Sequence, residues 1–403
     1  MRDFLLGRDP QDYDVATNAR PEQVRQIFGH RQTAAVGASF GVILVRGPGK
    51  AGTVEVATFR TEGPYRDGRR PESVAFTTPE EDAQRRDFTI NGMFYDPITH
   101  DVLDYVGGER DLSAGLVRAI GDPHDRMRED KLRMLRAVRF AAALEFELDP
   151  TTAAAIREMA GEIHVVSAER IAQELRRMLV DSQRRRAMEL AWQVGLLSQI
   201  FPELNPILAA EPAEKSTEAF QRIGQMLHLL EKPSFETALA VLLHVLFTSE
   251  TSPDQTVKTI DRICRRLRLS NRETEQLSWL LVHQYALADA PRLQPATLKR
   301  LLAHPLIRDL LAVSRVERIV TNDDLAPVIF CEEFLQNTPL EEIDPPPLVT
   351  GDDLISRGLS PGPQFRNLLT AVRDAQLNGE ITTSAAALEL VDRLQRDGLG
   401  DKP

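Results

Sequence analysis

Cysteine is nearly absent from this sequence. The 403 residues contain only Cys264 and Cys331, which lie far apart and follow neither metal-ligand nor disulfide spacing. Small disulfide-stabilised scaffolds and structural zinc sites need several closely spaced thiols, so both classes are excluded. The scarcity of cysteine favours the reducing cytoplasm, which is the location we expect.

Long apolar runs are also missing. No segment approaches the roughly 20 consecutive apolar residues of a membrane-spanning helix, so no membrane partner is expected. No apolar signal sequence follows a basic start at the N-terminus. A repeat of about 20–50 residues is absent too, which argues against a solenoid. The length of 403 residues therefore predicts a globular protein of several domains.

Net positive charge is the third absence. Lys and Arg number 49 against 60 Asp and Glu, which gives a net charge of -11. Such a balance argues against indiscriminate binding of nucleic acid, and no DNA partner is expected. Basic residues nevertheless concentrate in three helical stretches, within 126–139, 176–186 and 258–268. Local basic surfaces of this kind contact phosphates even on an acidic protein.

The pattern that is present changes along the chain. Up to about residue 115, strand-like runs such as TAAVGASFGVILV and TVEVATF alternate with the helical stretch PEQVRQIFG, which predicts a mixed α and β domain. A polar segment over 60–84 is expected to be an irregular connection. From about residue 116 onward, apolar residues recur at helical spacing, and the clearest boundary is the proline-rich, acidic stretch 341–353.

Three carboxylates form a candidate metal site. Asp12 and Asp14 alternate in QDYDVAT, so in an extended strand both point to one face, and Glu55 in TVEVATF faces opposite to Val54 and Val56. Taken singly, such acids are equally typical of helix caps or exposed strands. Together they supply the oxygen ligands that Mg²⁺ prefers, with substrate phosphates completing the shell. We expect Asp12 and Asp14 to bind Mg²⁺ and Glu55 to assist catalysis.

The stretch RRDFTIN, residues 85–91, belongs to an ordered series of motifs. The others are RDFLLGRDPQDYDVAT, VEVATFR, YRDGRRP, DYVGGERDL, IGDP, REDKLRMLRAVRFAA and SAERIAQELRRML. Through about residue 180 the series resembles the class II nucleotidyltransferases, which are CCA-adding enzymes and bacterial poly(A) polymerases. The resemblance implies an α+β nucleotidyltransferase head with a mixed sheet (1–115), followed by an all-α neck (116–185), body (186–340) and RNA-binding tail (341–403).

The resemblance also implies how the base is chosen. Asp130 and Arg133 are three residues apart, and we expect them to share one helix face. Cytosine and adenine both present an amino donor beside a ring-nitrogen acceptor, which suits an accepting aspartate and a donating arginine, whereas uracil and guanine present the opposite pattern. Glu129, four residues before Arg133, is placed to orient its guanidinium.

Further side chains are assigned to the incoming nucleotide by the same resemblance. Arg86 is expected at the triphosphate, and Asp87 and Asn91 at the ribose, whose 2′-hydroxyl both donates and accepts. The segment 60–84 corresponds to a flexible loop of the family. The remaining expected nucleotide-binding residues are Arg2, Arg136 and Arg139.

Two features depart from the family pattern. The first family motif, Gly-Gly-x-Val-Arg-Asp, is represented here only from Met1-Arg2-Asp3 onward, so the first strand of the head is missing. We interpret Met1 as the family valine, read from a GUG start codon, and expect the reading frame to continue upstream. In LAVLLHVLF, Val245 stands where a His-Asp phosphohydrolase needs an aspartate after His244, so the body is expected to be a degenerate His-Asp-like domain.

These expectations lead to a template-independent RNA nucleotidyltransferase that adds C and A to the 3′ end of tRNA from CTP and ATP and releases pyrophosphate. Within the same class, the alternatives are a poly(A) polymerase or an enzyme that adds only CC or only A. An alternative of another class is a non-catalytic RNA-binding paralogue. Retention of the carboxylates argues against this last alternative, because a pure RNA binder has no use for metal ligands.

Overall fold

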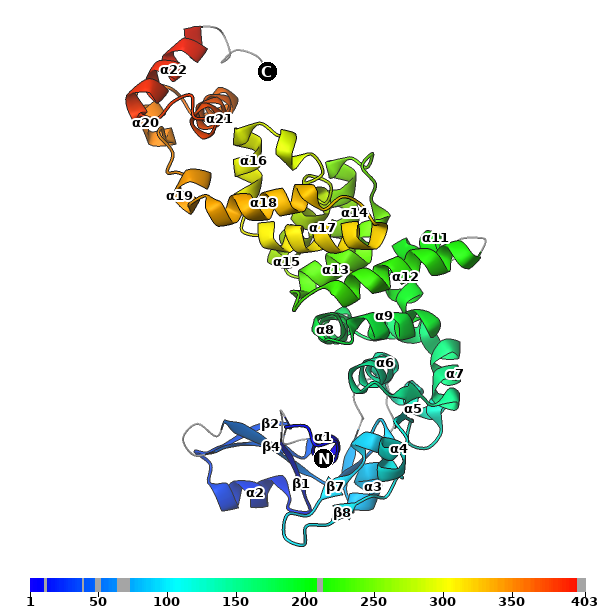
Figure 1. Cartoon of the computed structure of the whole chain (residues 1–403). Coiled ribbons are helices and arrows are strands. Elements are labelled where there is room, and N and C mark those ends of the chain that lie inside the picture. Colours follow the sequence, from blue (N-terminus) through cyan, green and yellow to red (C-terminus); the bar gives the residue numbers. More distant parts are fainter. Residues whose placement is uncertain (11–12, 38–39, 48–51, 64–72, 209–212, 397–403) are drawn as a thin grey trace. The chain divides into compact units, whose positions relative to one another are not determined.

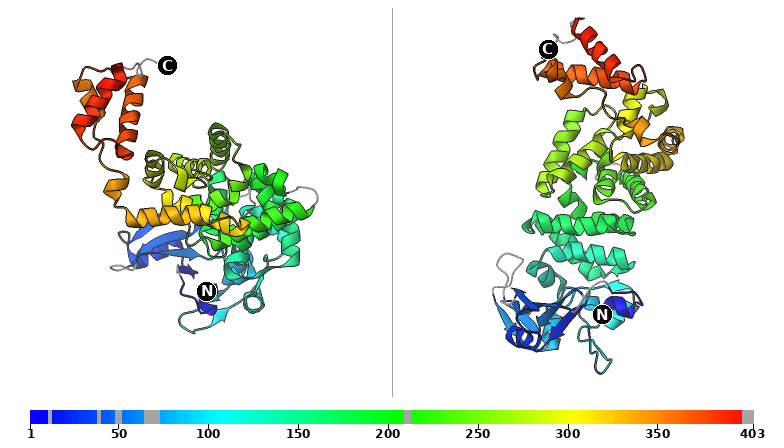
Figure 2. Two further views of the ribbon diagram at one scale, coloured as in Figure 1. Left: turned by 45° about the horizontal axis from the view of Figure 1, so that its top comes forward. Right: turned by 90° about the vertical axis from the view of Figure 1, so that its left-hand side faces the viewer.

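The computed structural model describes residues 1–403 except 11–12, 38–39, 48–51, 64–72, 209–212 and 397–403 (Figure 1). The chain divides into two compact units. The first comprises Met1–His228 with Arg262–Ser270, and the second comprises Leu229–Asp261 with Asn271–Pro403. The sheet lies in the blue, N-terminal part of the chain, and helices make up the green to red part (Figure 2).

A four-stranded mixed sheet lies at the start of the first unit. Its strand order is β1-β4-β3-β2, with β1 parallel to β4 and the other pairs antiparallel. The β-branched residues Ile43, Val45 and Val56 form a small core with Val24 of α2, so α2 covers one face of the sheet. The bounds are α1 (Arg2–Leu5), β1 (Asp14–Thr17), α2 (Pro21–Phe28), β2 (Thr33–Gly37), β3 (Val42–Arg46) and β4 (Thr53–Thr58).

The segment 60–84 is more ordered than its composition predicts. Strand β5 (Arg60–Glu62) pairs antiparallel with β6 (Val74–Phe76), and α3 (Pro79–Gln84) follows. Helix α3 starts with a proline at its first position, and the Thr78 hydroxyl accepts from the Glu81 N–H, which caps the helix. The expectation of an irregular connection was therefore wrong for these parts. The motif YRDGRRP lies outside the described residues.

Short strands and a helix complete this part of the unit before the long helices begin. Strand β9 pairs in parallel with β10, so the chain after residue 116 is not purely helical. The bounds are β7 (Phe94–Tyr95), β8 (Val102–Leu103), α4 (Gly108–Ser113), β9 (Leu116–Val117) and β10 (Glu147–Leu148).

Helices follow from Pro123 onward, as the apolar periodicity predicted. Helix α6 packs against α8 and α9, and the residues at helical spacing, such as Leu135, Val138, Leu175 and Met178, are buried. The bounds are α5 (Pro123–Glu129), α6 (Leu132–Leu144), α7 (Pro150–Met159), α8 (Ala168–Val180), α9 (Arg184–Gln193), α10 (Leu196–Ile200), α11 (Asn205–Leu208) and α12 (Ala213–Leu229).

The rest of the chain is helical as well. Residues 344–350, which lie between α19 and α20, are proline-rich and form no helix. Proline disfavours a helix because it removes a backbone donor and clashes with the preceding turn. The bounds are α13 (Phe235–Leu243), α14 (Pro253–Arg266), α15 (Asn271–Val282), α16 (Pro295–Leu302), α17 (Ile307–Thr321), α18 (Ala326–Asn337), α19 (Leu340–Ile343), α20 (Gly351–Ser356), α21 (Pro363–Leu377) and α22 (Ser384–Arg396). Among the helices described, none is both long and apolar enough to cross a membrane.

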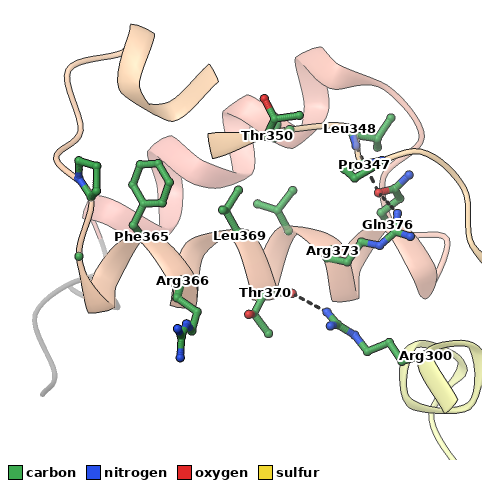
Figure 3. A pocket seen from close by; sticks show the side chains of 14 residues that line it. Arg300, Pro347, Leu348, Thr350, Phe365, Arg366, Leu369, Thr370, Arg373 and Gln376 are labelled. Carbon is green, nitrogen blue, oxygen red and sulfur yellow. Dashed lines mark hydrogen bonds between the residues drawn. The ribbon is translucent and has the colours of Figure 1, made fainter. Parts of the chain in front are cut away.

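A cavity of ≈ 670 Å³ opens in the second unit, between the extended residues around Leu348 and helix α21 (Figure 3). Phe365 and Leu369 give it an apolar wall, and Arg366 and Arg300 lie at its edge. Arg300 also donates to the backbone oxygen of Thr370 at 3.3 Å. The cavity therefore combines apolar surface with guanidinium groups.

Candidate active site

Two carboxylates meet on the N-terminal sheet. Asp14 is the first residue of β1, and Glu55 is its register partner on β4. Register partners on adjacent strands project from the same face, and Val56, the next residue along β4, points toward α2. Asp14 and Glu55 are therefore neighbours on the face opposite α2, where both are exposed. Asp12, the other expected ligand, lies outside the described residues.

The donor set suits a divalent ion. Within the described ranges, no group of three or more His, Cys, Asp or Glu side chains is arranged to hold a metal. Asp14 and Glu55 nevertheless place hard oxygen donors side by side, and Mg²⁺ is commonly held by one or two carboxylates plus substrate phosphates. The residues present therefore fit such an ion.

Asp87 is the centre of a buried polar network and is 8% exposed. Its Oδ2 accepts from Nε and Nη2 of Arg136 at 2.9 and 2.6 Å. Its Oδ1 accepts from the Asn91 amide at 3.1 Å and from the Phe88 N–H at 2.8 Å. The Asn91 amide oxygen accepts in turn from Nη1 of Arg2 at 2.9 Å. The structure thus joins four of the expected site residues in one network.

In this network, charge pairing and burial shift the pKa values of Asp87 and Arg136 in opposite directions. Burial by itself raises the pKa of Asp87, but the Arg136 charge and the hydrogen bonds from Asn91, Arg136 and Phe88 outweigh it. The pKa of Asp87 therefore lies below its ordinary 3.8. For Arg136, burial lowers the pKa and attraction to Asp87 raises it, and the net shift is upward. Both partners are stabilised in their charged forms.

We expect Asp87→Asn to reduce the acid sensitivity of the fold. A carboxyl whose folded pKa is lowered contributes stability above its unfolded pKa, and loses that contribution as pH falls through the folded value. Between about pH 5 and pH 3 the melting temperature should therefore fall further for the wild type than for Asp87→Asn. At neutral pH the variant should be less stable by about 1–3 kcal/mol, because Arg136 loses a charged partner.

Thermal melts at several pH values check this expectation. The control is Asp125→Asn on α5, which removes an exposed carboxylate whose ion pair with Arg128 is also exposed. This control should follow the wild-type curve. Equal acid sensitivity of the wild type and Asp87→Asn would contradict the stabilising role of the pair.

Arg86 is held by Asp82, a residue that the sequence motifs do not single out. Asp82 is 2% exposed and accepts from Nε and Nη2 of Arg86 at 3.3 and 3.1 Å. It also accepts from Nε and Nη2 of Arg85 at 2.9 and 2.7 Å, and from the Arg60 N–H of β5. The Arg86 guanidinium lies 4.4 Å from the centre of the Phe94 ring. The signal for Asp82 is its spacing, three and four residues before two arginines.

The expectation that Asp130 and Arg133 share one helix is wrong. Helix α5 ends at Glu129, Asp130 has extended backbone angles of φ −145° and ψ 105°, and α6 begins at Leu132. The Asp130 Oδ1 accepts from the Leu132 N–H at 3.0 Å. Aspartate disfavours helix interiors because its side chain bonds nearby backbone groups in this way. Asp130 therefore lies in a break between two helices.

Arg133 is 8% exposed and is fixed from three sides. Its Nη1 donates to Glu129, the contact that the spacing of these residues predicted, and to the backbone oxygen of Arg126 at 3.0 Å. Its Nη2 donates to the backbone oxygen of Arg85 at 3.2 Å. Among the described residues, the Nε of Arg133 has no acceptor. That N–H and the second N–H of Nη2 are the donors that remain for a ligand.

Helix α8 contributes one residue to each of two ion pairs. All four residues belong to the quoted motifs, but the motifs do not show which residues pair. Nη1 and Nη2 of Arg170 donate to Oδ1 and Oδ2 of Asp130 at 3.2 and 2.7 Å. One turn further, Glu174 accepts from Nε of Arg139 at 2.6 Å and is 2% exposed. Burial lowers the pKa of Arg139, and attraction to Glu174 only partly opposes that effect. Arg170 and Glu174 both belong to SAERIAQELRRML, but the sequence of the motif does not show which residues they contact.

Three of the expected arginines lie close to the ring of Phe140. Its ring centre lies 4.1 Å from the guanidinium carbon of Arg139, 4.8 Å from that of Arg2 and 5.2 Å from that of Arg136. Phe88 contacts the ring edge-on. The negative face of an aromatic ring attracts such cations and partly offsets their mutual repulsion. Arg2 of α1 and two arginines of α6 therefore lie around one ring, and each of them also pairs with a carboxylate, Asp3, Asp87 or Glu174.

His244 of the helical body belongs to no metal-binding group among the residues that the structure describes. The Nδ1 of His244 lies 2.6 Å from the backbone oxygen of Val241. Burial lowers the pKa of His244, and this hydrogen bond raises it by less. A neutral ring bonded to its own helix suits a structural histidine. Cys264 and Cys331 are buried and unpaired with each other.

Comparison with known proteins reveals similarity along the whole chain. Residues 1–118 match a family described as the Poly A polymerase head domain, and residues 145–208 match one described as the probable RNA and SrmB-binding site of polymerase A. The CCA-adding enzyme of Geobacillus stearothermophilus is 34% identical over 389 residues, which cover 94% of this chain and 88% of the relative. Poly(A) polymerase I of Escherichia coli O157:H7 is 34% identical over 352 residues, which cover 79% of this chain and 74% of the relative.

The fold is similar to a solved structure as well. The crystal structure of the Bacillus stearothermophilus CCA-adding enzyme in complex with CTP superposes with a TM-score of 0.71 and 28% sequence identity. The similarity covers 98% of this chain and 92% of that one.

Proposed function

Because the chain belongs to the family of CCA-adding enzymes and poly(A) polymerases, we propose that it adds C and A to the 3′ end of tRNA from CTP and ATP, with release of pyrophosphate. The observation that carries the proposal is the presence of two kinds of site in one compact unit. Adjacent carboxylates on β1 and β4 suit phosphoryl-transfer chemistry, and the break between α5 and α6 holds an acceptor and a donor suited to a base.

We assign the carboxylates to the metal and the primer. Asp12 and Asp14 are the ligands of a divalent ion, which we take to be Mg²⁺, and Glu55 assists in activating the primer 3′-hydroxyl. When bound, the ion would neutralise charge on the triphosphate and on the leaving pyrophosphate. The exposure of Asp14 and Glu55 on the face opposite α2 supports this assignment, because substrate can reach both.

The remaining residues position the nucleotide. Arg86, oriented by Asp82, binds the triphosphate, and the arginines around Phe140 add donors for the nucleotide. Asp87 and Asn91 contact the ribose. A fixed arrangement of donors of this kind contributes to the rate because little reorganisation is needed during the reaction.

Base selection is assigned to the break between α5 and α6. Asp130 accepts from the amino group that cytosine and adenine share, and the Arg133 Nε donates to the adjacent ring nitrogen. Uracil and guanine would place acceptor against acceptor and donor against donor. Glu129 supports the assignment because it accepts from Nη1 of Arg133 and so orients the guanidinium.

The domain roles follow from the same proposal. The head (1–115) carries the chemistry, the neck (116–185) selects the base, the body (186–340) has no hydrolase activity, and the tail (341–403) binds RNA. We place the reaction in the cytoplasm, which suits two buried cysteines that form no disulfide with each other.

Poly(A) polymerase activity is the second candidate, because the Escherichia coli relative is as similar in identity as the CCA-adding one. The greater coverage of this chain by the CCA-adding relative, 94% against 79%, favours CCA addition. Incubation with tRNA that lacks CCA, with CTP alone, ATP alone and both, followed by sequencing of the products, decides between them. Addition of CCA and then arrest is expected, whereas long A tracts would identify a poly(A) polymerase.

A further inference from the structure

The orientation of Asp130 is not set by a helix. Its backbone is extended between α5 and α6, and among the described residues the only hydrogen bond from a nearby residue to its carboxylate is the one from the Leu132 N–H to Oδ1. A single bond to one oxygen leaves the carboxylate free to turn about its last torsion, which has a broad energy minimum. A further contact is needed to fix the plane of the carboxylate.

Arg170 supplies that contact. Its two terminal nitrogens donate to the two oxygens of Asp130, at 3.2 and 2.7 Å. A two-pronged contact of this kind fixes the plane of the carboxylate as well as its position, which a single ammonium group does not do. Both side chains are mostly buried, at 22% exposed for Arg170 and 16% for Asp130, so solvent competes weakly for the pair.

The remaining acceptor capacity of Asp130 is then defined. Oδ1 already accepts two hydrogen bonds, from Leu132 and Arg170, whereas Oδ2 accepts one. An ionised carboxylate offers about four acceptor sites in all, two on each oxygen. One site on Oδ2 is therefore left for a donor, and its direction is fixed by Arg170.

Arg170 is itself mounted on a rigid support. Helix α8 buries Ile171, Leu175 and Leu179, and one turn beyond Arg170 the buried Glu174 binds Arg139 of α6. The helix is thus attached to α6 by its apolar face and by an ion pair. Arg133 also lies on α6. Helix α8 therefore fixes the position of Asp130 relative to Arg133, although Asp130 itself lies between α5 and α6.

We propose that Arg170 is a positioning residue for base selection, which sets the carboxylate of Asp130 at the angle needed to accept from the amino group of cytosine or adenine. The proposal rests on the base-selecting role of Asp130 and Arg133. Without Arg170, the carboxylate turns and the site loses its preference for an amino group over the carbonyl of uracil or guanine.

The test compares two substitutions of Arg170. Arg170→Met removes the charge and keeps the length, and Arg170→Lys keeps the charge and removes the two-pronged contact. The matched control is Arg177→Met, on the same helix, where the half-exposed arginine contacts Glu174 and not Asp130. The measurement is kcat/KM for single addition of CTP and of UTP to tRNA lacking CCA, together with thermal melts.

We expect Arg170→Met to lower the ratio of CTP to UTP efficiency by about tenfold or more, with Arg170→Lys intermediate and Arg177→Met unchanged. In the background of Asp130→Asn, Arg170→Met should have no further effect on the ratio, because its action passes through Asp130. A purely structural role predicts instead an equal loss for both nucleotides and a lowered melting temperature.

Three results would overturn the proposal. One is an unchanged ratio in Arg170→Met, and another is a full further loss of the ratio when Arg170→Met is added to Asp130→Asn. If Asp130→Asn alone leaves the ratio unchanged while CCA is still added, the base-selecting role of Asp130 fails together with that of Arg170. If the wild type adds no C at all, the proposed function fails, and product sequencing detects that separately.

Discussion

Asp14→Ala is expected to abolish nucleotide addition while tRNA binding persists. Asp14 lies beside Glu55 on the exposed face of the sheet, and without it the site loses a ligand for the ion that neutralises the triphosphate. Loss of one charge-stabilising group at an active centre commonly costs 10²–10³-fold in kcat, and we expect at least about that much. Binding of tRNA depends instead on many phosphate contacts and should change little.

The measurement is the rate of addition of C to tRNA lacking CCA, with filter binding of the same tRNA. The control is Glu22→Ala, which removes an exposed carboxylate from the first turn of α2, on the other side of the sheet. This variant should add nucleotides at the wild-type rate. Addition by Asp14→Ala at a rate near that of the control would refute the metal assignment.

Arg133→Ala is expected to lose base discrimination more than triphosphate affinity. Its Nε, in the first turn of α6, has no acceptor among the described residues, and the contact that we assign to it is to the base edge. A site that hydrogen-bonds its substrate rejects analogues that lack the matching groups by large factors, because polar groups of the site then stay unpaired. Preference for CTP over UTP should therefore fall by about 10²-fold or more.

The matched control for this change is Arg128→Ala, which removes an exposed arginine of α5 whose partner is the exposed Asp125. Discrimination by this variant should equal that of the wild type. Arg133→Ala also leaves Glu129 with one fewer partner, so melts are needed to show that the fold persists. A folded Arg133→Ala with wild-type discrimination against UTP would exclude the assigned base contact.

The sequence was sufficient wherever one local rule decides the outcome. Alternation in TVEVATF predicted that Glu55 faces away from Val56, and the register of β1 and β4 places Asp14 beside it. Apolar spacing predicted α6 and α8, because most of the stability of a helix comes from its buried face. The four-residue separation of Glu129 and Arg133 predicted their ion pair, which forms although α5 ends at Glu129 and Arg133 lies on α6.

Prediction from the sequence failed where distant segments meet or where a side chain competes with the helix. Spacing alone treated Asp130 as helical, but its bond to the Leu132 N–H ends the helical geometry. Arg170 contacts Asp130 across 40 residues of sequence, and no local pattern encodes that separation. The order in the described parts of 60–84 was missed because each strand has only three residues, and their pairing is visible only in three dimensions.

The two neighbouring arginines that share Asp82 do not act as separate units. One buried carboxylate receives both guanidinium groups, Arg85 on Oδ1 and Arg86 on Oδ2, as well as the Arg60 N–H on Oδ1. Truncating either arginine therefore changes the carboxylate to which the other is bound. The effects of Arg85 and Arg86 substitutions are therefore coupled, and their sum is a poor guide to the double variant. A substitution at one of these positions therefore alters, through Asp82, the contacts that hold the arginine at the other.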